Sequence, residues 1–381
     1  MKICSITTIP NSMWNFMVPE AIALSKDGWD SVVISSFSEN DLQKIPNEIR
    51  AYSVPMERTY NLKTAVKCIF LLYRIFRKET FDVVQYGTTH ACLFGSIAAF
   101  LARTPHRVFL QWGPTGYNDF TGLKRAFTKS VEILIGKLST TIRTVSRKNL
   151  IESVKDGLYP QKKASVVGEG GTIGVNLEDY PIEKRGVYSK EIRNKYGLNN
   201  SDFVFGFTGR ISRPKGVNEL LEAFKSILER HSAKLMLIGA DESVSDLPLL
   251  EWAKECHDVI LTGPIPHKDM AKYFAAIDLL VHPTYREGFG MVLQEAMAIG
   301  TPIITTDIPG PSEVIEDGIS GMLVPVKNSR VLETAMLEAL ENTEAFIKLG
   351  ENGRKRVEKH FERNHRLKLL VEDKRKLFKS R

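Results

Sequence analysis

The sequence predicts an α/β protein made of two doubly wound, Rossmann-like domains, and three observations support this fold class. The chain has 381 residues, and at about 150 residues per domain two or three domains are expected. Short, continuously apolar segments alternate with segments of helical periodicity, which is typical of a parallel sheet covered by helices on both faces. The same alternation then begins again in the second half of the chain.

Each element follows from the local pattern of apolar residues. In the first half, strands are expected at 2–6, 31–35, 82–85, 107–111, 140–145 and 164–167, with helices at 18–26, 62–79 and 91–103. In the second half, strands are expected at 203–208, 234–238, 259–261, 279–282 and 302–305, with helices at 217–229, 249–256, 267–274 and 291–299. A linker is expected at 180–186 and a basic helix at 361–378. The expected limits are therefore 1–182 for the first domain, 187–360 for the second and 361–381 for a C-terminal helix.

Composition excludes several classes of protein. No apolar run approaches the roughly 18 residues that a membrane-spanning helix needs. The N-terminal segment MKICSITTIP is typical of a first strand and has no small-residue cleavage site, so a signal peptide is not expected. The four cysteines stand in apolar stretches without metal-ligand spacing, which indicates reduced, buried thiols and a cytoplasmic protein.

Positive charge is concentrated in the first half of the chain. Residues 1–185 hold 24 Lys and Arg against 17 Asp and Glu, which accounts for the whole net charge of +7. The segment 62–79 combines five basic residues with an apolar face, and Lys124, Arg125, Lys129 and Lys137 form a second basic stretch. Two interpretations stay open, a helix that packs on the core with a solvated basic side and a helix that lies on an anionic membrane surface. Nucleic acid is not an expected partner, because aromatic and basic residues are little interleaved.

The most informative stretch is REGFGMVLQEAMAIGTPIITTD at 286–307. Glu287 and Glu295 bracket a Gly-Phe-Gly turn, an apolar helix follows, and a strand begins after Gly300. A glycine-rich entry to a helix presents backbone N–H groups that suit an anion such as a diphosphate. A carboxylate next to an anion site is instead suited to accept hydrogen bonds from hydroxyl groups. A diphosphate together with hydroxyl groups predicts a nucleotide-sugar ligand.

A second motif, Gly209-Arg210-Ile211-Ser212-Arg213-Pro214-Lys215-Gly216, follows the first expected strand of the second half. Gly209 permits a close backbone approach, Arg210 offers a planar fork for phosphate oxygens, and Lys215 offers a point charge. A basic surface turn is the alternative interpretation of this motif alone.

Together these motifs resemble the family-4 retaining glycosyltransferases of GT-B fold, and the resemblance extends over nearly the whole chain. It implies two Rossmann-like domains that face each other across a cleft, the first (1–182) binding the acceptor and the second (187–360) binding the nucleotide-sugar. It also implies a last helix that crosses back to the first domain. It also implies that Arg210 and Lys215 hold the donor diphosphate, that Glu287 binds donor-sugar hydroxyls and that Glu295 binds the ribose. The residues implied to act on the transferred group are Arg210, Lys215 and Glu287, and those implied to contact the donor are Gly209, Ile265, Gly288, Phe289, Gly290, Met291 and Glu295.

The first half departs from the family in one loop. Many members carry a histidine after the strand at 107–111, whereas Trp112 stands there in this chain. Trp112 is expected either to stack on a sugar ring or to pack the interior. Two further loops, Thr7–Ser12 and Gly87–His90, follow strands and are weaker candidates for acceptor contacts.

The resemblance implies that a sugar, a hexose or N-acetylhexosamine, moves from a nucleotide diphosphate donor, most readily a UDP-sugar, to a saccharide acceptor. The first half looks most like transferases of capsule, exopolysaccharide or O-antigen synthesis, which implies a lipid-linked acceptor and a protein at the inner face of the plasma membrane. No Asp-x-Asp sequence is present to hold a divalent metal, so neither a metal nor another cofactor is expected. Three alternatives stay open, a nucleotide-sugar epimerase of the same fold, a non-catalytic nucleotide-sugar-binding subunit and a soluble transferase that acts on free sugars.

Overall fold

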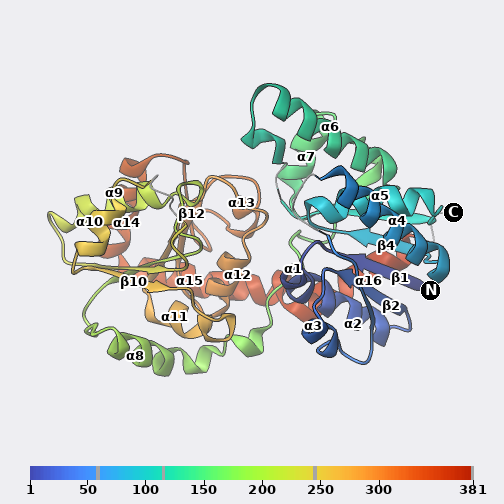
Figure 1. Cartoon of the computed structure of the whole chain (residues 1–381). Helices are drawn as coiled ribbons and strands as arrows, with labels where there is room; N and C mark the ends of the chain where they lie inside the picture. The colour runs from blue at the N-terminus through green and yellow to red at the C-terminus, as the bar shows by residue number, and fades with distance from the viewer. Residues whose placement is uncertain (57–60, 114–115, 243–246, 379–381) are drawn as a thin grey trace. The chain divides into compact units, whose positions relative to one another are not determined.

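The computed structural model describes residues 1–56, 61–113, 116–242 and 247–378, and it divides into two compact units. Unit 1 contains residues 1–173 and 364–381, and unit 2 contains residues 174–363. Figure 1 shows that each unit combines a β-sheet with helices packed on it. In the described residues, no helix combines the length and apolar character that a membrane span requires.

Unit 1 is built on a seven-stranded parallel sheet of order β3-β2-β1-β4-β5-β6-β7. The strands are β1 (Lys2–Ile6), β2 (Asp30–Ser35), β3 (Arg50–Ser53), β4 (Val83–Tyr86), β5 (His106–Gln111), β6 (Thr141–Thr144) and β7 (Ala164–Val166). The helices are α1 (Pro10–Ser12), α2 (Val18–Lys26), α3 (Glu39–Gln43), α4 (Leu62–Glu79), α5 (Thr89–Leu101), α6 (Gly122–Leu138), α7 (Arg147–Lys155) and α16 (Arg363–Lys376). Short 3₁₀ or π turns occupy Met13–Met17, Gly116–Asp119 and Gln161–Lys163.

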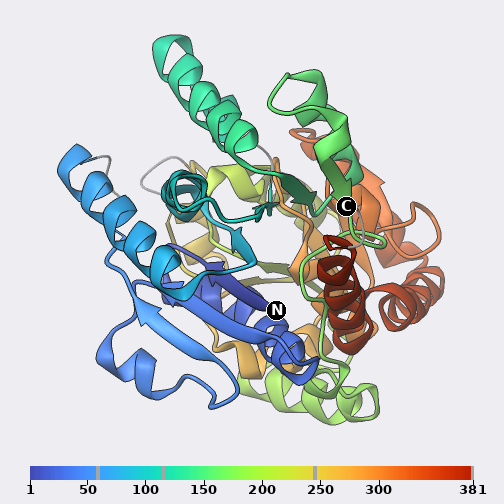
Figure 2. The same ribbon diagram turned by 90° about the vertical axis from the view of Figure 1, so that its right-hand side faces the viewer.

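Alternating strand residues of unit 1 enter two separate cores, as a sheet covered on both faces requires. Cys4 and Val84 pack with α4, α5 and α6 on one face, whereas Ile3 and Val83 pack with α2 and α16 on the other. Figure 2 shows the long helices α4 and α6 along their lengths. The cysteines are free thiols, of which Cys256 is only half-buried, and the others are buried.

Unit 2 repeats this plan with a six-stranded parallel sheet of order β10-β9-β8-β11-β12-β13. Its strands are β8 (Val204–Thr208), β9 (Lys234–Ile238), β10 (Val259–Gly263), β11 (Leu279–His282), β12 (Ile303–Thr306) and β13 (Met322–Val324). Its helices are α8 (Arg185–Lys195), α9 (Val217–Leu228), α10 (Leu250–Glu255), α11 (Met270–Ala276), α12 (Met291–Ala298), α13 (Pro311–Val314), α14 (Ser329–Glu341) and α15 (Thr343–Arg356). Short 3₁₀ or π turns occupy Leu177–Asp179, Ile182–Lys184, Arg213–Lys215, His267–Asp269 and Val357–Phe361.

The expected fold class is confirmed, and the differences lie at the connections. Every expected strand is present. The sheets also contain β3 and β13, short strands of four and three residues that were not expected. The expected linker at 180–186 is wrong, because it forms a 3₁₀ turn and the first residues of α8. The segment from Gly174 belongs to unit 2 because Val175 pairs with Glu362 and the Tyr180 carbonyl accepts a hydrogen bond from Arg354.

The C-terminal helix α16 is fastened to unit 1 by charged side chains. Arg143 pairs with Asp373 at 2.9 Å, and Lys374 Nζ lies 2.9 Å from Glu20 Oε1 with both side chains buried. Arg366, also buried, donates to the carbonyl groups of Val167 and Gly171. Because buried charges must be paired, these contacts fix how the helix lies against the sheet.

In each sheet the chain reverses its order at one point, and ligands of such folds bind at the carboxyl ends of the strands on either side. In unit 1 this point lies between β1 and β4, and in unit 2 between β8 and β11. The loops that follow these four strands are therefore the places to look for a site.

Candidate functional site

Two loops meet at the reversal point of the sheet in unit 2. The first, 209–216, follows β8, and the second, 283–290, follows β11. The backbone N–H of Tyr285 donates to the Pro214 carbonyl at 2.9 Å, which ties one loop to the other. Gly216 has φ 70°, and a Cβ built on it would lie 2.0 Å from the Pro283 oxygen. Only glycine therefore allows the two backbones to approach this closely.

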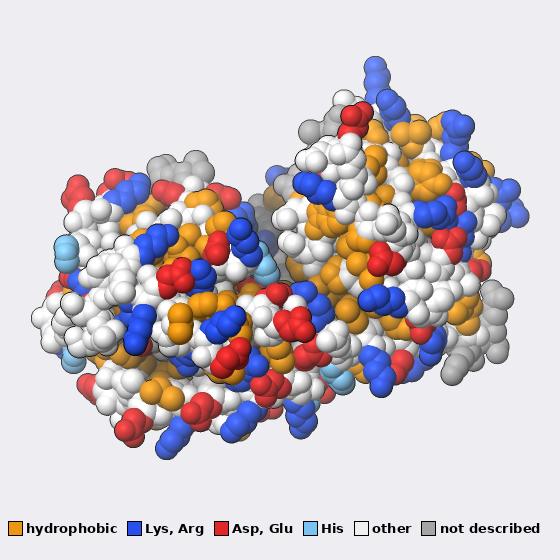
Figure 3. All heavy atoms as spheres, turned by 90° about the horizontal axis from the view of Figure 1, so that it is seen from below, with side chains coloured by type: hydrophobic (Ala, Val, Ile, Leu, Met, Phe, Trp, Pro, Cys, Tyr) orange, Lys and Arg blue, Asp and Glu red, His pale blue; other side chains and the backbone are white. Residues whose placement is uncertain are grey.

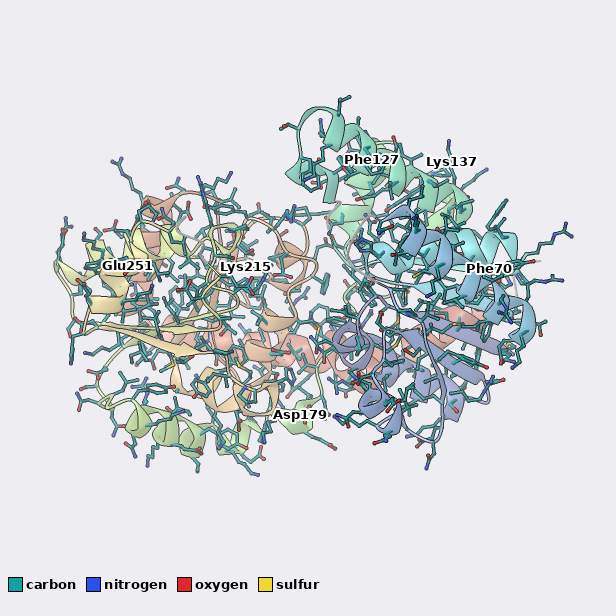
Figure 4. The ribbon with its side chains drawn as sticks, in the orientation of Figure 1. Phe70, Phe127, Lys137, Asp179, Lys215 and Glu251 are labelled. Carbon is teal, nitrogen blue, oxygen red and sulfur yellow. The ribbon has the colours of Figure 1, made fainter. Side chains whose placement is uncertain are left out.

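The meeting of the loops brings Lys215 and Glu287 together. Lys215 Nζ lies 2.7 Å from Glu287 Oε2, and the two side chains are 19% and 24% exposed. Figure 4 marks where Lys215 lies in unit 2. The other carboxylate oxygen accepts a hydrogen bond from the Gly288 N–H at 3.0 Å. Burial opposes ionisation of Glu287, but the nearby His282 and the charge of Lys215 outweigh it and hold its pKa well below the usual range.

His282, at the end of β11, is a site residue that the sequence motifs did not reveal. Its side chain is buried and stacks on the Phe207 ring, with centroids 5.9 Å apart. Its Nε2 lies 3.7 Å from Glu287 Oε2, which is beyond hydrogen-bond distance, and both ring nitrogens are buried without a hydrogen-bond partner in the described structure. Burial lowers the pKa of His282, so the imidazole is neutral at neutral pH. A histidine that ends an apolar strand beside the reversal point is the signal that could have found it.

Helix α12 begins where the second loop ends. Gly290 is its N-cap with φ 90°, and a Cβ there would lie 2.9 Å from Leu293 Cδ1. Phe289 is buried and packs edge-on against Phe361 at 5.7 Å between centroids. A Cβ on Gly310 would lie 2.6 Å from the Gly288 oxygen, so a glycine there lets the neighbouring loop support this turn. The positive end of the α12 dipole, from Met291, is thus held beside Glu287.

Arg210 stands apart from this pair. Its side chain is mostly exposed and makes an ion pair with Glu242 at 3.0 Å. Gly209, which precedes Arg210, has φ 143°. A Cβ built on Gly239 would lie 1.8 Å from the carbonyl oxygen of Gly209. The structure therefore places Arg210 on the same loop as Lys215 and shows no contact between Arg210 and the Lys215–Glu287 pair.

The second acid of the motif, Glu295, lies in a different cluster on α12. It is buried, and its Oε1 lies 3.0 Å from Nε2 of His267, whose side chain is mostly exposed. The half-buried Ile265 precedes this histidine in the loop after β10. Tyr180 lies nearby, and burial followed by the negative charges of Glu295 and Asp179 raises the pKa of its hydroxyl. His267 is a second residue that the motifs missed, since no sequence pattern links it to Glu295.

In unit 1 the loops after β1 and β4 also meet. The hydroxyl groups of Thr8 and Thr88 lie 2.7 Å apart, and the Thr8 N–H donates to Thr88 Oγ1 at 2.8 Å. Trp112 packs against Phe16, with ring centroids 5.2 Å apart. Across both units, the described residues contain no group of three or more His, Cys, Asp or Glu side chains suited to a metal ion.

Two family models cover most of the chain. The model described as "Glycosyl transferase 4-like" matches residues 5–145, and "Glycosyl transferases group 1" matches residues 189–356. The chain is a member of the family-4 glycosyltransferases of GT-B fold. It is 29% identical over 365 residues to a capsular polysaccharide biosynthesis glycosyltransferase, CapM, of Staphylococcus aureus, covering 94% of this chain and 93% of that protein.

Further relatives extend this result. The glycosyltransferase is 25% identical over 344 residues to the Escherichia coli UDP-Gal:α-D-GlcNAc-diphosphoundecaprenol α-1,3-galactosyltransferase, with 86% and 85% of the two chains covered. Its fold matches that of Anabaena HepE in complex with UDP at a TM-score of 0.77 and 19% identity, over 98% and 99% of the chains. Sucrose-phosphate synthase of Thermosynechococcus elongatus matches at a TM-score of 0.80 and 19% identity over the full length of both chains.

The closeness of the two loops predicts that Gly216→Ala destabilises unit 2. The new methyl group overlaps the Pro283 oxygen, so the free energy of unfolding should fall by about 2–3 kcal/mol. Gly197→Ala is the matched control, because Gly197 has φ 67° and open space around it and should cost only about 1 kcal/mol. Urea unfolding followed by circular dichroism measures both, and equal losses would contradict the role of the close approach.

The contact between His267 and Glu295 predicts a coupled titration. The hydrogen bond to Glu295 raises the pKa of His267 against the opposing effect of burial, so Glu295→Gln should move this pKa downward. Because the folded-state pKa of His267 is raised, the stability gained from its protonation is full below its unfolded-state pKa and is lost as the pH rises through the folded-state pKa. NMR titration of the imidazole C–H signal measures the shift. Glu344→Gln, an exposed change on α15, should leave that signal unchanged, and an identical titration in Glu295→Gln would contradict the assignment.

Proposed function

We propose that the protein transfers a sugar from a nucleoside diphosphate sugar, a UDP-sugar, to a saccharide acceptor, with retention of anomeric configuration. The Lys215–Glu287 pair at the start of α12 carries this proposal, because it places a cation, a helix N-terminus and an ionised acid side by side. A diphosphate attracted to the first two would present its sugar hydroxyl groups to the acid. HepE, which shares the fold, forms a complex with UDP, and the E. coli relative is named for UDP-galactose, which supports this donor class.

In the proposed reaction, positive charge supplied by the protein stabilises the departing nucleoside diphosphate. Lys215 and the start of α12 provide it, and Arg210 adds to it by releasing Glu242 and turning toward the phosphates. Glu287 orients the sugar by accepting hydrogen bonds from its hydroxyl groups, and Glu295 does the same for the ribose. The leaving phosphate takes the proton of the acceptor hydroxyl, which attacks on the same face. No divalent metal has a part in this scheme.

Two alternative functions are separated from this one by simple tests. An epimerase of the same fold would change a UDP-sugar in the absence of an acceptor, whereas a transferase would hydrolyse it slowly at most. A non-catalytic subunit would bind the donor without turnover.

Replacement of the paired charges should abolish most of the activity. Glu287→Gln and Lys215→Ala each remove one electrostatic contact to the reacting groups, so turnover should fall about 10²–10³-fold with the fold intact. Release of UDP from UDP-galactose, UDP-glucose or UDP-N-acetylglucosamine measures turnover, with undecaprenyl-diphosphate-linked N-acetylglucosamine as acceptor and EDTA present because no metal is required. Glu251→Gln, an exposed change on α10, is the matched control. Full activity in either site variant, or a strict need for Mg²⁺ or Mn²⁺, would contradict the proposal.

We also propose that the acceptor is lipid-linked and that unit 1 docks on an anionic membrane surface. Helices α4, α5 and α6 expose large apolar side chains, which are Leu62, Val66, Phe70, Phe100, Leu101, Leu123, Phe127 and Leu134. An apolar pocket of about 420 Å³ between α4 and α5 is lined by Val66, Ile69, Phe70, Tyr73 and Leu101. We call these residues together the apolar surface of unit 1. Soluble monomers rarely expose so many large apolar side chains on neighbouring helices.

Basic side chains accompany the apolar surface. Lys63, Lys67, Arg74, Arg77 and Lys78 on α4 are all exposed, and so are Lys124, Arg125 and Lys137 on α6. Figure 4 marks the exposed residues Phe70, Phe127 and Lys137 on unit 1, and Figure 3 shows Lys and Arg beside hydrophobic side chains on the right-hand lobe. Apolar anchors together with positive charge fit an anionic lipid surface, and the name of the E. coli relative includes a diphosphoundecaprenol acceptor.

Vesicle binding tests this surface. The protein should sediment with vesicles that contain phosphatidylglycerol and much less with pure phosphatidylcholine, and about 0.5 M salt should release it because each basic residue contributes about 1 kcal/mol. Phe70→Ser with Phe127→Ser should weaken the binding at least ten-fold, since both exposed rings would insert. Val187→Ser, which removes an exposed apolar side chain on α8, is the control. Equal sedimentation of the double variant and the unchanged protein would rule out this docking surface.

A further inference from the structure

Unit 1 contains a pocket that the donor site does not use. It has a volume of about 200 Å³ and lies where β4 and β5 end, with α6 beside it. Its lining includes Thr88, Thr89, Gln111, Trp112, Gly116 and Glu132, together with apolar side chains such as Phe109 and Leu110. It therefore occupies the carboxyl edge of the sheet, next to the reversal point between β1 and β4.

Glu132 on α6 is the only ionisable carboxyl group of this lining. Its Oε1 accepts a hydrogen bond from the Gly116 N–H at 3.0 Å. In the described part of the chain, no cation lies within ion-pair distance of it and no second protein donor reaches it. Burial raises the pKa of Glu132 to about 7, against the opposing effect of the Gly116 hydrogen bond. Such a half-buried carboxyl group gains most from a ligand that donates a hydrogen bond to it.

A second wall of the pocket is a fixed aromatic ring. Trp112 also packs against Phe16. A Cβ built on Gly87 would lie 2.7 Å from the Trp112 ring, so the ring can occupy this position only because residue 87 is a glycine. An indole held in this way offers a rigid apolar face on which the C–H face of a sugar ring can lie. The ring is positioned by its packing and needs no ligand to order it.

The remaining wall adds hydroxyl groups on a strained loop. Thr88 has φ 69°, an uncommon backbone conformation for a β-branched residue, and its side chain is held by Thr8. Thr89 beside it is exposed and lines the pocket. Backbone strain of this kind is concentrated at binding sites, where the surrounding structure maintains it.

We propose that this pocket binds a sugar residue of the acceptor, with Glu132 accepting a hydrogen bond from one of its hydroxyl groups and Trp112 contacting its ring. The lining contains no Lys or Arg in the described chain, so its chemistry favours a neutral polyhydroxyl group over a phosphate. The inference rests on the proposed glycosyltransferase reaction and adds the residues of unit 1 that select the acceptor.

Titration with alkyl glycosides tests the proposal. Octyl glucoside, octyl galactoside and octyl N-acetylglucosaminide are added below their micellar concentrations, and binding is followed by tryptophan fluorescence and by saturation-transfer NMR. At least one glycoside should bind, and Trp112→Phe should remove its fluorescence change. At a pH above the pKa of Glu132, where the carboxylate is ionised, Glu132→Gln should weaken the affinity about ten-fold because a charge-assisted hydrogen bond is lost. Glu152→Gln, an exposed change on α7, is the matched control.

The donor site is measured in the same samples by the thermal stabilisation that UDP produces. Glu132→Gln should leave this stabilisation unchanged, and failure of UDP to stabilise the unchanged protein would count against the proposed function and not against the pocket. Affinity of Glu132→Gln for the glycosides within two-fold of the unchanged protein would overturn the inference, as would binding of none of them. If Glu132→Gln does not fold, Thr89→Val in the same pocket provides the second test and should weaken the same glycoside.

Discussion

The ion pair between Lys215 and Glu287 is the interaction on which the candidate site depends. It joins two loops that follow separate strands, and both partners are largely removed from water. Partial burial of two charges is costly unless they are close and hydrogen-bonded, and this pair meets both conditions through its 2.7 Å contact and the Gly288 N–H. The glycine at 216 makes the approach of the two loops possible. The sheet topology brings the two loops to the same edge of the sheet, and the ion pair then holds them against each other.

The surroundings of each ionisable group near this pair determine whether the group is charged. The charge of Lys215 favours the ionised form of Glu287, while burial favours the neutral form of His282. Glu295 has its own partner, His267, and so the two acids of one helix region are held by different bases. This separation suits two carboxylates that contact different parts of one extended ligand. It does not suit a glycosidase, in which two carboxyl groups flank a single bond with divided pKa values.

The sequence predicts best what depends on local pattern. The apolar strands, the amphipathic helix at Leu62–Glu79 and the Gly-rich turn before Met291 each carry their signal within a few residues, and the structure has them in place. The short strands β3 and β13 lack such a signal. His267 and Glu132 were missed because each acquires its meaning from a residue distant in the chain, as His267 does from Glu295 at 28 positions away. For Arg210, which pairs with Glu242, the role in donor binding stays a prediction.

The role proposed for Trp112 follows from how the proposed reaction handles the proton of the acceptor. Family members often place a histidine in that loop, and a tryptophan at the same point can neither take up nor release a proton there. If the leaving phosphate accepts the acceptor proton, unit 1 needs no base, and the loop after β5 is free to serve recognition alone. A rigid indole beside Glu132 meets that need, because it orients a sugar ring while the carboxyl group selects one of its hydroxyl groups. In the proposed reaction, unit 2 stabilises the charge of the leaving group and unit 1 selects the acceptor, so that each property can change through its own loops.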